Sequence, residues 1–318
     1  DETYDSHAVC NQALEALRKA GLRHSFAGGA HKWHGFTPLN RYSRHILSCQ
    51  LPAVKQSGVQ DFLLTLWGDE GAECSPFSVL PTLAYLAQEN LEGECGRFAE
   101  RICCRLTGCT DEQLLDLGLP NELYDGPVKK ACNPAKYLFY VDALYGMEDL
   151  PTAPDYTLRY ARTAGKLEEY AQEQTPFSYL FETQAKLCRV LELKATLTQD
   201  IDSAYRSKDT QALKQIGTVR IPNLLQRLRE FAQTLRAQWY RENKPFGFEV
   251  QEYRIYGLIG RLDSIGQRLC AYVEGRGELP ELEEEKLTPQ VMPNDPYHGC
   301  RMYNSVVQTI TYCYFSQF

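Results

Sequence analysis

One short segment of the chain combines an aromatic ring with several carboxylates. The apolar run at residues 62–66, which the pattern predicts to be a buried strand, is followed by Trp67, Asp69, Glu70 and Glu73 before an apolar helix begins. A strand that ends in such a loop and restarts as a helix is typical of the mouth of an α/β barrel, where the loop after each strand builds the active site. An indole covers the apolar face of a sugar and carboxylates accept hydrogen bonds from its hydroxyls, so the segment predicts a carbohydrate site.

Composition narrows the classes of protein. The 318 residues suggest about two domains, and 43% hydrophobic residues allow a sizeable core. The formal net charge is -7 without a basic stripe, which argues against nucleic-acid binding because phosphate contacts need clustered Lys and Arg. No apolar stretch is long enough for a membrane helix and no signal-peptide pattern opens the chain, so we expect no membrane partner.

The cysteines indicate a reducing compartment. There are 12 of them, scattered and without a CxxC pair. We expect reduced, buried, small hydrophobic side chains in a cytoplasmic protein, since a zinc site would need a ligand spacing that the sequence lacks. The chain starts at Asp1 without a methionine, and we expect this start to be a cut.

The first part of the chain alternates between helix and strand patterns. Helices are predicted at about residues 6–20, 41–56 and 76–90, with the second interrupted or closed near Pro52, and strands at 24–29 and 59–66. This order is typical of a parallel α/β fold. Because two strands do not make a stable parallel sheet by themselves, residues 1–92 are expected to be the last two β/α units of a larger TIM-type barrel.

The remainder reads as all-α. Long helices are predicted at about residues 98–106, 156–173, 177–205, 221–241 and 248–274. Residues 93–318 are therefore expected to form a C-terminal helical domain that packs without chemistry of its own. Residues 281–286 form a charge run expected to be solvated, and the final segment at 303–318 is left open between helix and strand.

Several segments resemble the bacterial β-N-acetylhexosaminidases of glycoside hydrolase family 20. His24–Phe36 together with Asn40–Ser43 is similar to their seventh strand and its loop, and Leu63–Glu73 to their eighth strand. The similarity continues through the helical part, so that it spans nearly the whole chain. The segments that carry it there are Asn133–Leu138, Asp142–Gly146, Arg236–Tyr240, Asn243–Glu249 and Arg254.

The resemblance implies that the catalytic pair is missing from this chain. In the family an Asp followed by a Glu stands after the fourth barrel strand, and nothing before His24 can be that strand. The neighbouring Asp69 and Glu70 correspond to a sugar-binding position instead. The resemblance therefore implies no catalytic residue here, no metal and no organic cofactor, and a chain that supplies walls of the substrate pocket.

Four residues are the candidate substrate contacts. The resemblance places Trp67 against the acetamido group or the sugar face, and Asp69 as the acceptor for the O4 and O6 hydroxyls. Trp33 is a second wall, and Glu70 a weaker contact. The structural alternatives are a core tryptophan for Trp67, a surface or core aromatic residue of a loop for Trp33, and a helix cap for Asp69, although Ser75 fits that capping role better.

Their polar neighbours have structural alternatives as well. Glu70 and Glu73 are candidates for ion pairs with Arg41 or Lys32. Asn40 and Arg41 either shape the loop, which is the expected role, or reach the substrate. His31 and His34 flank Lys32 and Trp33, but two histidines without a third ligand at a suitable spacing do not make a metal site.

The sequence thus predicts part of an exo-acting β-N-acetylhexosaminidase. The whole protein would remove terminal β-linked GlcNAc or GalNAc from small glycans by substrate-assisted retaining catalysis, whereas this chain alone would be inactive. Dimerisation through the helical domain stays open. One alternative is a non-catalytic helical interaction protein that retains a barrel remnant, which should be soluble and monodisperse despite its strand edges. Another is a hydrolase that uses Asp69, Glu70 and Glu73 themselves, whose crowding in one loop argues against it.

Overall fold

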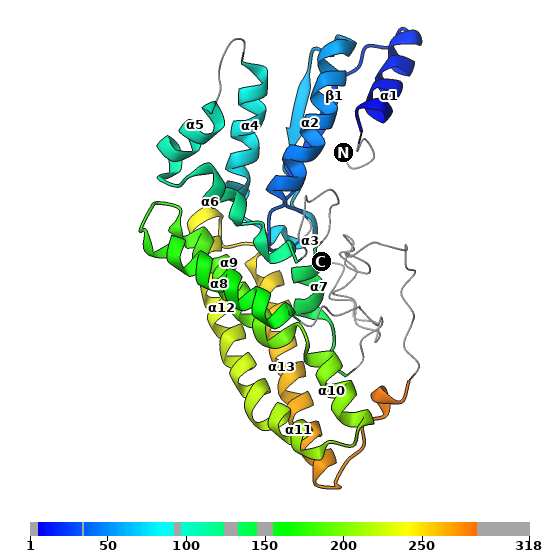
Figure 1. Ribbon diagram of the computed structural model, residues 1–318, viewed down its shortest axis with the longest axis vertical. Helices are drawn as coiled ribbons and strands as arrows, with labels where there is room; N and C mark the ends of the chain where they lie inside the picture. Colours follow the sequence, from blue (N-terminus) through cyan, green and yellow to red (C-terminus); the bar gives the residue numbers. More distant parts are fainter. Residues whose placement is uncertain (1–5, 34, 92–96, 124–132, 145–154, 285–318) are drawn as a thin grey trace. The chain divides into compact units, whose positions relative to one another are not determined.

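The structure is a computed structural model that describes residues 6–33, 35–91, 97–123, 133–144 and 155–284. The chain divides into two compact units, whose elements are labelled in Figure 1. The first holds Asp1–Ala131 and Gln174–Phe177, and the second holds Cys132–Glu173 and Ser178–Phe318. The expected boundary between residues 92 and 93 stays a prediction, because compactness does not mark where a barrel sequence ends.

Side-chain caps begin several helices of the first unit. Ser6 Oγ accepts a hydrogen bond from the first turn of α1, and Ser75 Oγ accepts one from the amide of Phe77 at 3.1 Å. Thr110 and Gln113 form a reciprocal capping box at α6. The elements are α1 (His7–Lys19), β1 (Phe26–Gly29), α2 (Asn40–Ser57), β2 (Phe62–Thr65), α3 (Asp69–Ala72), the 3-10 turn η1 (Pro76–Val79), α4 (Leu80–Asn90), α5 (Phe98–Thr107), α6 (Asp111–Asp116) and the 3-10 turn η2 (Leu119–Asn121).

The two strands form a parallel pair with unequal faces. Phe26 pairs in register with Phe62, and their rings stack 5.6 Å apart against apolar residues of α1 and α2. On the other face Ala27 pairs with Leu63, whose side chain is 61% exposed. Helix α2 connects the strands, so the expected order of helix, strand, helix, strand, helix is confirmed.

The described residues of the second unit form helices that are joined by turns, and they contain no strand. Helix α9 packs against α8 and α12, and α12 packs against α13. Apolar faces meet between them, and the rings of Phe139 and Phe231 pack edge to face with centroids 5.4 Å apart. The elements are α7 (Pro134–Tyr140), α8 (Tyr156–Gln172), α9 (Ser178–Lys194), α10 (Leu197–Arg206), α11 (Thr210–Gln215), the π-turn η3 (Ile216–Arg220), α12 (Ile221–Glu242), α13 (Phe248–Val273) and the 3-10 turn η4 (Pro280–Leu282).

Two helix predictions were wrong in detail. The single helix expected at residues 177–205 is broken into α9 and α10, because Arg220 donates from Nε to the carbonyl of Leu193 at 2.8 Å and from Nη2 to Thr196 Oγ1 at 2.9 Å. These bonds take backbone and side-chain acceptors at the junction. Conversely, α2 continues through Pro52, which lies on the exposed side while Leu51 and Ala53 are buried, so packing outweighs the missing amide donor.

Other predictions fall partly outside the described residues. The segment at 303–318, residues 285 and 286 of the charge run, and His34 are among these. The helix expected at 76–90 begins as η1 and continues as α4, and the helices expected near α5, α8, α12 and α13 are confirmed.

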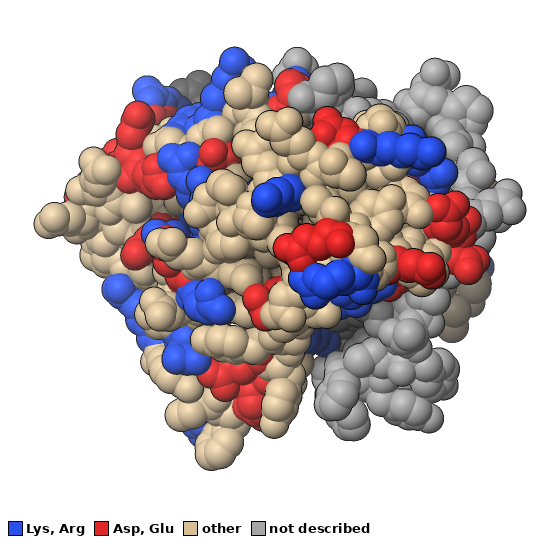
Figure 2. Space-filling view, turned by 90° about the horizontal axis from the view of Figure 1, so that it is seen from below, with Lys and Arg blue, Asp and Glu red and all other residues tan. Residues whose placement is uncertain are grey.

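Three further observations concern the surface charges, the length of the helices and the burial of the cysteines. On the face drawn in Figure 2, acidic and basic side chains are interspersed. Among the described residues, no helix is both long and apolar enough to span a membrane. Cys104 is exposed, against the expectation of burial, because it lies on the outer side of α5, whereas Cys10, Cys74, Cys103, Cys109 and Cys188 are buried.

Candidate functional site

The carboxyl ends of β1 and β2 place two tryptophan-bearing loops side by side. The strands are parallel, so their loops leave from the same edge of the sheet. The amide of Ala30 donates to the carbonyl of Thr65 at 3.0 Å, which carries the pairing one residue beyond β1. Farther along, Lys32 Nζ donates to the backbone carbonyl of Trp67 at 3.1 Å. The structure therefore brings the loop of Trp33 and the loop of Trp67 together.

Trp33 packs within its own loop. Its ring stacks on His31 with centroids 4.4 Å apart, and the buried His31 packs edge-on to Tyr42 of α2 at 4.8 Å. A Cβ on Gly29 would lie 2.6 Å from Cη2 of Trp33, so the strand must end in glycine for the indole to lie across it. His31 is fixed in turn, because its amide donates to Ser43 Oγ at 2.9 Å. Trp33 is thus a half-buried wall supported by α2.

Trp67 presents its indole to solvent. Its side chain is 58% exposed while its backbone carbonyl is held by Lys32. Asp69 is exposed at the first residue of α3, and Glu70 follows it there, with a side chain outside those described. Ser75 caps η1, as expected, so Asp69 is not needed for that role.

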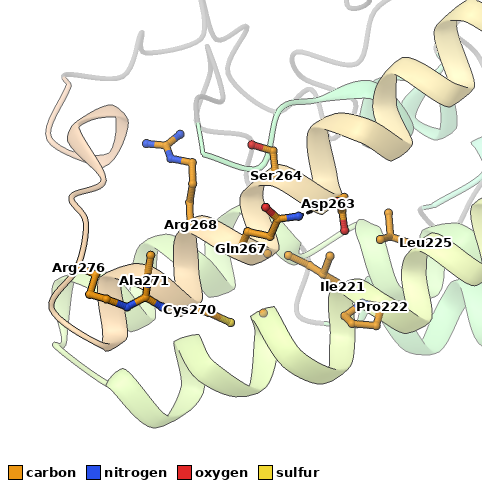
Figure 3. Close-up of a pocket in the computed structure, with 12 residues that line it drawn as sticks. Ile221, Pro222, Leu225, Asp263, Ser264, Gln267, Arg268, Cys270, Ala271 and Arg276 are labelled. Atoms are coloured by element: carbon orange, nitrogen blue, oxygen red, sulfur yellow. Dashed lines mark hydrogen bonds between the residues drawn. The ribbon is translucent and has the colours of Figure 1, made fainter.

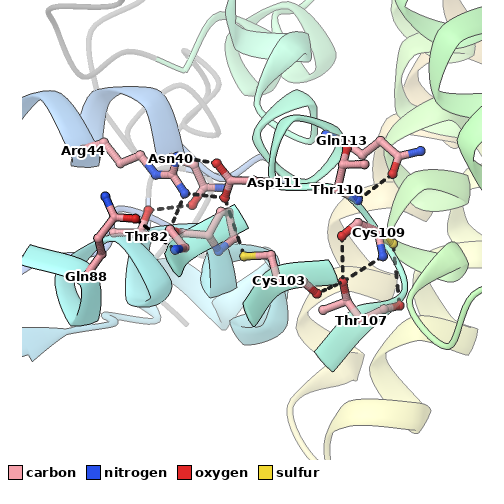
Figure 4. Close-up of polar contacts among 12 residues, drawn as sticks. Asn40, Arg44, Thr82, Gln88, Cys103, Thr107, Cys109, Thr110, Asp111 and Gln113 are labelled. Carbon is pink, nitrogen blue, oxygen red and sulfur yellow. Dashed lines mark hydrogen bonds and ion pairs between the residues drawn. The ribbon is translucent and has the colours of Figure 1, made fainter. Parts of the chain in front are cut away.

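Asn40 joins the helix that follows the first loop to the helix that follows the second. Its Nδ2 donates to the carbonyl of Ser78 at 2.8 Å, and its Oδ1 accepts from Thr82 Oγ1 at 2.8 Å. All three residues are buried, and Figure 4 draws the contact with Thr82. The expectation of a structural role for Asn40 is confirmed.

Arg41 is the centre of a partly buried ion-pair cluster. It contacts Glu112, Asp116 at 2.8 Å and Glu122 at 3.3 Å. Burial alone would lower the pKa of Arg41, but Glu122 and the hydrogen-bonded Asp116 raise it above its ordinary value. Burial also raises the pKa of Glu122, which Arg41 opposes. These pairs give Arg41 a structural role in place of the ion pairs considered for it with Glu70 and Glu73.

A second cluster fixes α2 against α6 (Figure 4). Arg44 holds Asp111 with two hydrogen bonds, of 2.7 Å from Nη1 and 2.5 Å from Nη2. Cys103 Sγ lies 3.5 Å from Asp111 Oδ1. Burial first and the Asp111 charge second raise the pKa of Cys103 to about 12, so the thiol stays protonated at neutral pH. Such a thiol is a poor nucleophile and a poor metal ligand.

The second unit contains a hollow of about 580 Å³ between α12 and α13 (Figure 3). Charged side chains on its rim already pair: Gln267 Nε2 donates to Asp263 at 2.9 Å, and Arg268 Nη2 to Glu281 at 2.7 Å. Its floor is apolar, with Ile221 pointing into it. The hollow therefore does not show the set of uncommitted polar groups that fixes a sugar.

Metal binding finds no support in the described part of the chain, where no group of three or more His, Cys, Asp or Glu side chains could hold an ion.

Sequence reasoning missed two features of the strand-end site, namely the stack of Trp33 on His31 and the bond from Lys32 to Trp67. The signal for the second was positional. Gly29 and Thr65 are register partners at the end of the strand pair. Lys32 lies three residues after Gly29 and Trp67 lies two residues after Thr65, so both residues lie just past the end of the ladder.

Comparison with known families places the chain. The sequence model of the Glycoside Hydrolase 20C C-terminal domain matches residues 113–300, more than half of the chain. No curated protein matches it. The match covers most of the described helices of the second unit, in agreement with the resemblance seen in the sequence. The chain belongs to the family of the glycoside hydrolase 20C C-terminal domain, which is a domain of glycoside hydrolases.

Proposed function

We propose that this chain is the C-terminal part of an exo-acting β-N-acetylhexosaminidase of glycoside hydrolase family 20. In this proposal residues 1–92 are the last two β/α units of its barrel and residues 93–318 its helical domain. The substrate is a small glycan with a terminal β-linked N-acetylhexosamine. The observation that carries the proposal is the exposed indole of Trp67 beside the loop of Trp33, at the carboxyl ends of two parallel strands in a member of this family.

The open face of the strand pair supports the barrel assignment. Leu63 is 61% exposed on the face opposite α1 and α2. A parallel strand with an apolar, uncovered face is unusual, because parallel sheets are normally covered on both sides. In a closed barrel that face would line the packed interior.

The site would act on the substrate by shape and hydrogen bonding. Trp67 covers the apolar face of the sugar or its acetamido group, Trp33 forms a second wall, and Asp69 accepts hydrogen bonds from the O4 and O6 hydroxyls, with Glu70 beside it. The chemistry that the resemblance implies uses the substrate's own acetamido carbonyl, whose oxygen attacks the anomeric carbon as the glycosidic bond breaks. A Glu protonates the leaving oxygen and then activates water, while an Asp orients the acetamide. By the resemblance that Asp–Glu pair follows the fourth barrel strand, and Asp69 with Glu70 takes a sugar-binding position instead.

Turnover of aryl glycosides by the full-length protein tests the proposal. We expect hydrolysis of an aryl β-N-acetylglucosaminide and none of the matching β-glucoside, which lacks the acetamido nucleophile. Trp67→Ala should raise KM about tenfold, because a stacked aromatic contact contributes on the order of 1 kcal/mol or more. Phe246→Ala is the control, since Phe246 is an aromatic side chain of the second unit that is 83% exposed.

The isolated chain supplies the second half of the test. It should show no turnover, and its open strand face should make it prone to association. Robust turnover by this chain that disappears in Trp67→Ala would move catalysis into these residues and overturn the proposal. A soluble, monodisperse chain, combined with a full-length protein inactive on both glycosides, would favour a helical interaction protein. A cytoplasmic location and a homodimer formed through the helical domain belong to the proposal as well.

A further inference from the structure

Lys32 is a buried lysine whose ammonium group joins the two loops of the strand-end site. The residue is 5% exposed, and its Nζ donates to the backbone carbonyl of Trp67 at 3.1 Å. Lys32 belongs to the loop after β1, whereas Trp67 belongs to the loop after β2. The contact therefore couples two segments that are separated by the whole of α2.

The position of this bond explains what it does. Backbone pairing between the strands ends with the bond from Ala30 to Thr65. Beyond it the segment after β1 leads to α2 and the segment after β2 leads to α3. A long side chain that reaches across at this point replaces the backbone ladder. Since desolvating a lysine costs free energy, its burial at the end of the ladder requires a compensating contact.

Trp67 is held on one side and open on the other. Its carbonyl is bound by Lys32, yet its side chain is 58% exposed. Trp33 differs, because its ring packs against His31 and across Gly29. An exposed indole on a mobile loop would lose conformational entropy when a sugar stacks on it, whereas an indole on a fixed peptide loses less.

We propose that Lys32 is the positioning residue of Trp67: its ammonium group fixes the Trp67 peptide so that the exposed indole is held ready for a sugar ring. The sugar in this statement rests on the proposed function, while the fixing of Trp67 does not. Lys32 acts through Trp67 and has no part in bond breaking.

Fluorine NMR of the full-length protein labelled with 5-fluorotryptophan tests the proposal. The Trp67 resonance is identified as the one that vanishes in Trp67→Phe. In Lys32→Met we expect this resonance to shift and broaden, and N-acetylglucosamine to bind about tenfold more weakly, because a hydrogen bond from a charged donor is lost. Lys32→Gln, which keeps a shorter donor, should fall between, and it replaces Lys32→Met if that variant does not fold.

Lys55→Met is the matched control. Lys55 Nζ also donates to a backbone carbonyl, that of Glu89, but at an exposed position away from both loops. It should leave the Trp67 resonance and sugar binding unchanged. The resonance of Trp239 reports that the second unit is folded, and the resonance of Trp33, which stacks on His31, reports that the first unit is folded.

The outcomes separate the two proposals. An unchanged Trp67 resonance in a folded Lys32→Met or Lys32→Gln variant overturns the role of Lys32. If Lys32→Met alters the Trp67 resonance but the wild-type protein does not respond to N-acetylglucosamine, the positioning of Trp67 is supported and the proposed function is overturned. Changes in both, without any in Lys55→Met, support both.

Discussion

The two compact units of this chain differ in how their apolar surfaces are covered. The second buries apolar helix faces against one another, and residues such as Leu228 and Phe231 are fully buried. The first leaves one face of its strand pair open at Leu63 and holds its helices together with polar cross-links at Asn40 and Arg44. Both units also carry ion pairs, such as Arg189 with Glu168 in the second, so the contrast between them lies in the open strand face of the first.

This difference bears on where function lies. Apolar packing is non-directional, so it stabilises a bundle without fixing particular side chains at the surface. Hydrogen bonds and ion pairs have direction, and those of the first unit fix the ends of the two loops that carry Trp33 and Trp67. The comparison predicts that truncating an apolar side chain in the closed core of the second unit costs more than truncating one on the open strand face of the first.

Phe231→Ala should have the largest effect on stability. The ring is fully buried and packs on Phe139, so its removal should lower the free energy of unfolding of the second unit by about 3–5 kcal/mol. Leu63→Ala, at an exposed position of the first unit, should cost about 0.5 kcal/mol or less. Urea unfolding followed by the fluorine resonance of Trp239, in protein labelled with 5-fluorotryptophan, reports the second unit, and similar losses for both variants would remove the contrast between the units.

Lys194 provides a pH-dependent test inside the apolar unit. Its Nζ donates to the carbonyls of Leu138 at 3.3 Å and Val141 at 2.6 Å. Burial, strengthened by Arg220 and opposed by Asp142, lowers the pKa of Lys194 to about 8. The unfolded chain, with its ordinary lysine pKa, therefore binds more protons between pH 8 and about 10.5. The free energy of unfolding of the protein should therefore rise by about 3 kcal/mol between pH 8 and about 10.5. Below pH 8 the folded protein bears the full cost of burying the charged lysine.

Lys194→Met isolates this effect from the other groups that titrate at high pH. Methionine keeps the unbranched chain but removes the charge, so the difference in unfolding free energy between wild type and variant should change with pH across the window. Urea titrations at pH 7.5, 9 and 10.5, followed by Trp239, measure it. A difference that is constant with pH would show that Lys194 is not the group responsible.

Asn40→Ala should have an intermediate effect in the first unit. It leaves the carbonyl of Ser78 and the hydroxyl of Thr82 buried without their partner in Asn40, at a cost of about 2 kcal/mol. Asn90→Ala is the matched control, because the Asn90 amide donates to the carbonyl of Leu86 at an exposed position. Thermal unfolding followed by the fluorine resonances of Trp33 and Trp67, in protein labelled with 5-fluorotryptophan, compares the two, and equal midpoints would contradict a cross-linking role for Asn40.

Sequence patterns predicted the elements better than the contacts. Helical spacing identifies α12 because one face of it is apolar along its full length, and that signal is local. The break between α9 and α10 was missed because it depends on Arg220, some 25 residues farther along the chain. The passage of α2 through Pro52 was missed for a similar reason, since burial of its neighbours decides it.

The candidate site shows the same division. Residue types identified Trp33, Trp67 and Asp69 as candidates, and the exposure of Trp67 and Asp69 is compatible with that interpretation. The position of Lys32 just past the first strand indicates only that it lies near the loop of Trp67. Its acceptor could not be predicted, because that acceptor is a backbone carbonyl, which every residue has and no pattern marks. The roles of these residues toward a sugar stay predictions.

An effect on stability as small as that of Leu63→Ala should come from Trp67→Ala, and it sharpens the comparison within the first unit itself. Because the indole is 58% exposed, its removal should lower the free energy of unfolding by about 0.5 kcal/mol. Trp33→Ala should cost about 1–2 kcal/mol, since its ring stacks on His31 and lies across Gly29. Chemical denaturation of each variant, followed by far-UV circular dichroism, measures the difference. Were Trp67→Ala to destabilise the chain as much as Trp33→Ala, the Trp67 indole would be a packing element; a small cost would agree with the proposed role of the indole in binding a sugar.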